Sequence, residues 1–81
     1  TRVRKADVIR YLLEKEGIAD PGEAVMIGDR KHDVLGAKEV GMDSIGVLYG
    51  YGSREELEEA GAGRIAASVE ELEEYLLSQV D

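Results

Sequence analysis

The stretch AVMIGDRKHD, residues 24–33, decides how the rest of the chain is arranged. Ala24 to Ile27 are apolar at both alternating positions, which predicts a strand that is buried on both faces of a parallel sheet. Gly28 and Asp29 follow at the carboxyl end of this strand. Binding sites in open parallel sheets lie beyond the carboxyl ends of the strands. We therefore expect the loop that begins at Gly28 to belong to a functional site.

Two helices are predicted to flank this strand in the sequence. Upstream, helical spacing of apolar residues predicts a helix that begins near Lys5 and ends at Gly17, with a turn over residues 18–22. Downstream, the spacing predicts a helix that Gly41 closes. The apolar faces of these helices are expected to contain Val8, Ile9, Leu12 and Leu13 in the first, and Val34, Leu35, Ala37 and Val40 in the second.

The remaining residues predict two further strands and two further helices. Residues 44–48 and 64–66 are expected to be strands, and residues 49–52 a loop. Ser53 with Glu56, and Ser68 with Glu71, have the Ser-x-x-Glu spacing that caps a helix reciprocally. The first of these helices is expected to end at Gly61.

The predicted order α-β-α-β-α-β-α defines the fold class as α/β. Strand, helix and strand in succession imply right-handed crossovers and a three-layer, Rossmann-like arrangement with a three-stranded parallel sheet. The connections are short, so residues 1–81 are interpreted as one unit. A doubly wound domain normally begins on a central strand, and this chain opens with a helix. We therefore expect a further segment upstream.

Composition narrows the classes of function. The formal net charge is −8, from 18 acidic and 10 basic side chains, so nucleic acid is not an expected partner. No apolar run is long enough for a membrane span, and no signal peptide is evident, so we expect no membrane partner. There is no cysteine, which excludes disulfides and thiolate metal sites. A cytoplasmic protein is the default expectation.

Asp29 and Asp33 are the strongest candidates for chemistry. A turn that opens the next helix could bring both carboxylates together, and two carboxylates with phosphate oxygens are a usual way to hold Mg²⁺. The alternative interpretation is that Asp33 caps the helix and Asp29 merely ends the strand. Lys5 opposes the dipole of its helix, which fits a functional lysine or an exposed surface lysine equally. His32 is expected to face solvent.

Taken together, the chain resembles the haloacid-dehalogenase (HAD) superfamily, specifically its phosphoglycolate-phosphatase-like members. Residues 4–9 resemble the third motif of that family, whose lysine neutralises the phosphoryl group. Residues 25–37 resemble its fourth motif with the following helix, and residues 44–53 are similar to the next strand and loop. The resemblance covers almost the whole chain and implies a HAD-like catalytic core.

The resemblance implies a role for individual residues. Asp29 would be a direct Mg²⁺ ligand, and Asp33 a second acidic contact, direct or through water. Lys5 would stabilise the negative charge of an aspartyl-phosphate intermediate and its transition states. The substrate would be a small phosphorylated metabolite. The weaker assignments to the wall of the substrate site are Gly28 and Arg30 in the acidic loop, and Gly50 and Gly52 in residues 50–53.

The chain departs from the family at the nucleophile, which is an aspartate in an Asp-x-Asp motif. Aspartates occur here only at positions 7, 20, 29, 33, 43 and 81, and none lie two apart. The cap domain that selects substrate also has no counterpart. We therefore expect the C-terminal part of a catalytic core, which is inactive alone. The open alternative is a non-catalytic folding or assembly unit, either truncated or engineered, derived from the same fold.

The missing nucleophile strand leads to an expectation about partners. In the family sheet the fourth-motif strand lies beside the strand that carries the nucleophile, so residues 24–28 would become an edge. Unpaired backbone groups at such an edge template pairing with another chain. We expect the missing N-terminal half, or a second copy of this chain, to bind there.

Other phosphate- and cofactor-binding motifs fail on spacing. Gly50-Tyr51-Gly52 has Glu55 where a dinucleotide loop would place its third glycine, and there is no Gly-x-x-x-x-Gly-Lys phosphate loop. The adjacent acidic pair of a receiver domain is absent. His32 is three residues from Asp29, where a cobalamin-binding motif needs two.

Overall fold

Seven regular elements alternate along the chain in a computed structural model, which describes residues 4–78. The elements are α1 (Lys5–Lys15), β1 (Val25–Gly28), α2 (Lys31–Val40), β2 (Asp43–Val47), α3 (Arg54–Ala60), β3 (Arg64–Ala66) and α4 (Val69–Leu77). A short 3₁₀ turn, Pro21–Glu23, separates α1 from β1. The order α-β-α-β-α-β-α is confirmed.

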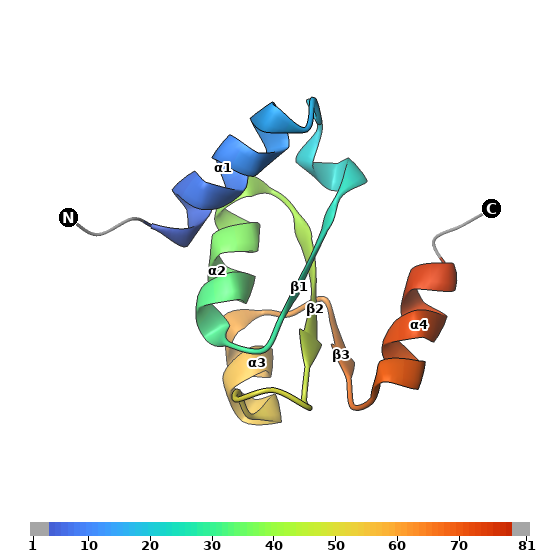
Figure 1. The fold of residues 1–81 in the computed structure, drawn as a ribbon. Coiled ribbons are helices and arrows are strands. Elements are labelled where there is room, and N and C mark those ends of the chain that lie inside the picture. The colour runs from blue at the N-terminus through green and yellow to red at the C-terminus, as the bar shows by residue number, and fades with distance from the viewer. Residues whose placement is uncertain (1–3, 79–81) are drawn as a thin grey trace.

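The three strands form one parallel sheet in the order β1-β2-β3. Gly28 pairs with Gly46, and Gly46 pairs with Ile65, so the carboxyl ends of the strands meet at one edge of the sheet. α1, α2 and α3 lie on one side of the sheet and α4 on the other (Figure 1). The expected three-layer α/β architecture is therefore confirmed.

Alternation of side chains along the strands divides the core between the two faces. Ile45 and Val47 of β2 point toward α4 and pack with Leu72, Tyr75 and Leu76. The opposite face is filled from the helices by two clusters, whose buried members are Ile9, Leu13, Ala37 and Met42 in one, and Val34, Leu57 and Ala60 in the other. No helix within residues 4–78 has the length and apolar character needed to cross a bilayer.

A glycine follows each of the helices α1, α2 and α3, at the position where the sequence predicts that the helix ends. Gly17, Gly41 and Gly61 have φ angles of +73°, +79° and +93°, in the left-handed region that side chains with a Cβ rarely adopt. Gly41 and Gly61 are the C-caps of α2 and α3. The boundaries of both helices therefore follow from the sequence.

The expectation that the first strand is buried on both faces is wrong. Val25 is 37% exposed and Ile27 is 42% exposed. β1 lies at the edge of the sheet, and α4 packs against β2 and β3, so nothing among residues 4–78 covers these two side chains. Three residues expected on buried helix faces are also exposed, namely Val8, Leu12 and Leu35.

The two predicted capping boxes are half formed. Ser53 accepts a hydrogen bond from the backbone N–H of Glu56, and Ser68 accepts one from that of Glu71, as expected. The returning bonds from the glutamates are not made. The Glu71 carboxylate accepts from the Tyr75 hydroxyl, and the Glu56 carboxylate crosses to α2. A donor one turn further along α4 therefore takes the Glu71 carboxylate, and donors about 25 residues away take that of Glu56.

Candidate phosphate- and metal-binding site

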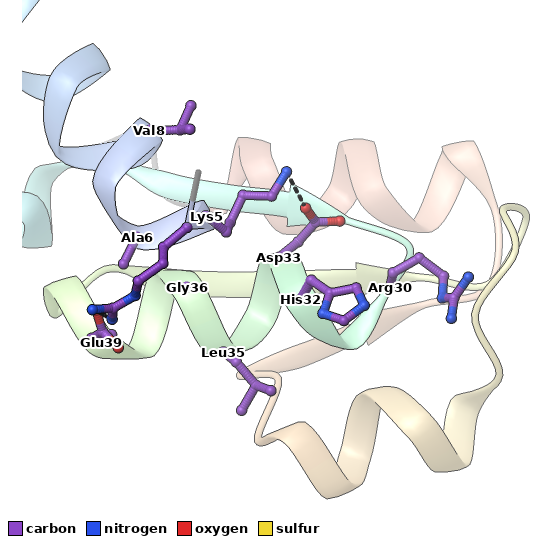
Figure 2. Close-up of a pocket in the computed structure, with 10 residues that line it drawn as sticks. Lys5, Ala6, Val8, Arg30, His32, Asp33, Leu35, Gly36 and Glu39 are labelled. Carbon is purple, nitrogen blue, oxygen red and sulfur yellow. Dashed lines mark hydrogen bonds and ion pairs between the residues drawn. The ribbon is translucent and has the colours of Figure 1, made fainter. Parts of the chain in front are cut away.

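An ion pair between Lys5 and Asp33 joins the first turns of α1 and α2. Nζ of Lys5 lies 3.0 Å from Oδ1 of Asp33 (Figure 2). The Asp33 side chain is 17% exposed and that of Lys5 is 44% exposed, so solvent and small solutes can reach the ammonium group. The N-cap of α2 is Arg30, so Asp33 lies in the first turn and is not the cap. The third- and fourth-motif candidates are thus brought together.

Two glycines make room for this pair. A Cβ at Gly36 would lie 2.6 Å from Cγ of Lys5, so the lysine stem can cross α2 only because position 36 has no side chain. A Cβ at Gly28 would lie 2.6 Å from Oδ2 of Asp33. Gly28 therefore seats Asp33 at the end of β1, whereas Gly36 seats Lys5. Sequence reasoning identified Gly28 and missed Gly36.

Asp29 is held by the loop that follows β2. Its Oδ2 accepts a hydrogen bond of 2.9 Å from the backbone N–H of Tyr51. A Cβ at Gly50 would collide with the Asp29 side chain, and one at Gly52 would collide with the Asp29 carbonyl oxygen. Gly50 and Gly52 are therefore required for the close approach of this loop to the acidic loop. The weak assignment of both glycines to the wall of the substrate site stays a prediction.

A hollow of about 660 Å³ opens between α1 and the start of α2. Its lining carries the basic groups of Arg4, Lys5 and Arg30, together with His32 and the carboxylates of Asp33 and Glu39. Arg4 pairs with Glu39 at one end. Arg30 extends away from the Lys5–Asp33 pair (Figure 2), and His32 is exposed as expected. Lys5 is thus the cation at the centre of the hollow.

Glu56 braces the acidic loop from α3. Its Oε2 accepts a hydrogen bond of 2.8 Å from the backbone N–H of Lys31 and one of 2.9 Å from Nε of Arg30. The Lys31 bond, followed by the Arg30 bond, lowers the pKa of the Glu56 carboxyl from its ordinary value. The spacing of Glu56 from Ser53 predicts only a local cap, so sequence reasoning missed this contact over 25 residues.

Carboxylate oxygens are the type of ligand that Mg²⁺ prefers, but few of them are brought together near Asp29. Among residues 4–78 no group of three or more His, Cys, Asp or Glu side chains is placed to hold a metal ion. The hydrogen bond described for the Asp29 side chain is accepted by Oδ2. Mg²⁺ usually keeps several waters and takes one or two protein carboxylates plus substrate phosphate. Asp29 and Asp33 are two carboxylates, the number and type of protein ligand that such a site uses.

Comparison with known proteins agrees with this geometry. The model of the HAD-hydrolase-like family matches residues 3–74, which is most of the chain. The chain therefore belongs to the HAD-hydrolase-like family, and the resemblance drawn from its motifs is confirmed.

Three individual relatives illustrate the match. The crystal structure of a predicted phosphatase from Clostridium acetobutylicum is 51% identical with a TM-score of 0.88, over 93% of this chain and 34% of that one. A 5'-nucleotidase from Pseudomonas aeruginosa is 53% identical over 57 residues, 70% of this chain and 25% of that protein. A phosphoglycolate phosphatase from Vibrio vulnificus is 36% identical over 69 residues, 85% of this chain and 30% of that protein. The chain thus spans between a quarter and about a third of these relatives.

Proposed function

We propose that the chain supplies the metal-binding acidic loop and the phosphate-neutralising lysine of a magnesium-dependent HAD-type phosphatase. The substrate class is a small phosphorylated metabolite, in line with the similarity to a phosphoglycolate phosphatase and a 5'-nucleotidase. The observation that carries the proposal is the Lys5–Asp33 pair at 3.0 Å, which joins the residues of the third- and fourth-motif stretches. A cytoplasmic location stays a prediction.

The arrangement suits phosphate chemistry because it places one cation opposite acidic oxygens. A phosphoryl group in the hollow would bring negative charge to the Lys5 ammonium, which can turn from Asp33 toward it because the lysine is only partly buried. Such preorganised charge is the main contribution that a protein makes to phosphoryl transfer. Asp29 and Asp33 would hold Mg²⁺, which when bound offsets phosphate charge.

The proposal predicts weak Mg²⁺ binding to the isolated chain. Only part of the ligand set is present, so saturation should need a high Mg²⁺ concentration. In an NMR titration the amide signals of residues 28–33 should shift, and Asp29→Asn should abolish these shifts. Asp43→Asn is the matched control. It removes the same charge at the amino end of β2, away from the carboxyl ends of the strands, and this variant should titrate like the parent chain.

Shifts that are confined to the acidic surfaces of α3 and α4 would contradict the proposal. Those helices carry several glutamates, including Glu58, Glu59, Glu73 and Glu74, and would respond to nonspecific screening. Such a result would favour the alternative, a non-catalytic assembly unit that kept the fold.

We further propose that the free edge of β1 binds another strand, from a separate N-terminal half or a second copy of the chain. Two observations support this pairing. β1 is an edge strand of the sheet, and its residues Val25 and Ile27 are exposed. No lysine or proline within residues 24–28 protects the edge. The net charge of −8 opposes self-association, although physiological salt screens part of it.

Edge pairing predicts association that a charge on β1 weakens. In sedimentation equilibrium over a wide concentration range, the chain should self-associate when no other half is present. Ile27→Lys should shift the equilibrium toward monomer, because an ammonium on the edge resists strand addition. Val69→Lys, at an exposed position of α4, is the control and should associate like the parent chain. A strict monomer with slowly exchanging amides at residues 25–27 would refute edge pairing.

A further inference from the structure

The amino end of α2 is capped by a side chain from another helix. Its N-cap residue, Arg30, makes no capping hydrogen bond with its own side chain. The first free N–H of the helix, that of Lys31, instead donates to Glu56 of α3. An uncapped helix terminus leaves its first N–H groups without partners, so a carboxylate from another element replaces the local cap.

We infer that Glu56 is a positioning residue for the proposed metal site, because its two bonds fix the turn that joins Asp29 to Asp33. This inference builds on the proposed function. Both bonds of Glu56 come from residues between the two carboxylates, namely Arg30 and Lys31. Removing it would free the peptide at Arg30 and Lys31, and the relative directions of Asp29 and Asp33 would then vary.

The surrounding contacts show that Glu56 belongs to a larger brace. The loop before α3 also contacts the acidic segment, since the Tyr51 N–H donates to Asp29 and Gly52 lies against the Asp29 carbonyl. Oε2 of Glu56 would lie 3.3 Å from a Cβ at Gly52, so brace and loop are in contact. The loop before α3 and the first turn of α3 therefore both contact the segment from Asp29 to Lys31.

Partners that orient metal ligands from outside the ligand set typically change metal affinity by about 10–100-fold when they are mutated. We expect Glu56→Ala to weaken Mg²⁺ binding by about tenfold. Glu56→Gln keeps an oxygen that can accept from the Lys31 N–H and loses only the negative charge that pairs with Arg30. This variant should recover part of the affinity.

The test combines two measurements on the 81-residue chain. The first is the Mg²⁺ dissociation constant from NMR shifts of residues 28–33. The second is hydrogen exchange of the Lys31 amide without metal, compared with the Ile45 amide in β2. Glu55→Ala is the control, because it removes the same charge from the same first turn of α3 without a bond to α2. Glu56→Ala should speed exchange at Lys31 and leave Ile45 unchanged.

Each outcome has a distinct meaning. Equal acceleration at Lys31 and Ile45 would show that Glu56 only supports overall stability, and would overturn the inference. Local acceleration with Mg²⁺ affinity unchanged within twofold would overturn it as well. If the parent chain itself shows no Mg²⁺ shifts at residues 28–33, the proposed function fails, and the role of Glu56 toward a metal site fails with it. Local acceleration in that case would still identify Glu56 as the cap of α2.

Discussion

Gly52→Ala should destabilise the chain by about 3 kcal/mol, at the upper end of the range for overpacking. A Cβ at this position would collide with the carbonyl oxygen of Asp29, which is backbone and cannot move aside like a side chain. Accommodating the methyl group would require the loop after β2 to separate from the acidic loop. For a chain of this length the whole free energy of unfolding is roughly 4–12 kcal/mol, so the loss is a large fraction.

The measurement is urea denaturation followed by circular dichroism. Gly22→Ala is the matched control, because its Cβ would meet a side chain, the Asp20 carboxylate, whose nearest atom is Oδ1 at 3.2 Å. That carboxylate needs to shift by only a few tenths of an ångström, so the control should lose no more than about 1 kcal/mol. Equal losses in the two variants would mean that the approach of Gly52 to Asp29 is not tight in solution.

The isolated chain should show no enzymatic phosphatase turnover with Mg²⁺ and p-nitrophenyl phosphate. Covalent catalysis divides hydrolysis into two easier steps, and the family resemblance assigns the attack to an aspartate of an Asp-x-Asp motif. No two aspartates of this chain lie two apart. Lys5 and the acidic loop can stabilise charge but cannot replace the nucleophile. Loss of a nucleophile can lower turnover by roughly 10⁶-fold.

A parallel assay of Asp29→Asn separates this expectation from contamination. If the parent chain and the variant show the same trace activity, that activity comes from another protein. Turnover at an ordinary enzymatic rate that Asp29→Asn abolishes would show that the chain has a nucleophile of its own. The assignment of an incomplete site would then be wrong.

Local sequence signals were sufficient to predict most of the fold. The apolar spacing of α1 and α2, together with Gly41 and Gly61, placed the helices because these signals act within a few residues. The carboxyl end of β1 likewise identified Gly28 and Asp29, since the position of a site on a parallel sheet follows from strand direction. Asp33 and Lys5 followed from the family motifs.

Contacts between distant segments could not be predicted in the same way. Gly36 makes room for Lys5, and Glu56 caps α2, yet in both cases the partner lies about 25 residues or more away in the sequence. The prediction that both faces of β1 are buried was wrong for a related reason. Apolar character shows that Val25 and Ile27 are suited to burial, but burial depends on which elements cover β1, and α4 packs on β2 and β3 instead.

The proposed metal site at Asp29 and Asp33 is tested most directly by paramagnetic Mn²⁺, which takes oxygen ligands like those of Mg²⁺. At trace Mn²⁺, the amide signals of residues 28–33 should broaden first, excess Mg²⁺ should restore them, and Asp29→Asn should prevent the broadening. Asp43→Asn should leave it intact. Broadening centred on the glutamates of α3 and α4, or unaffected by Asp29→Asn, would contradict the assignment of this loop as the metal-binding half of a phosphatase site.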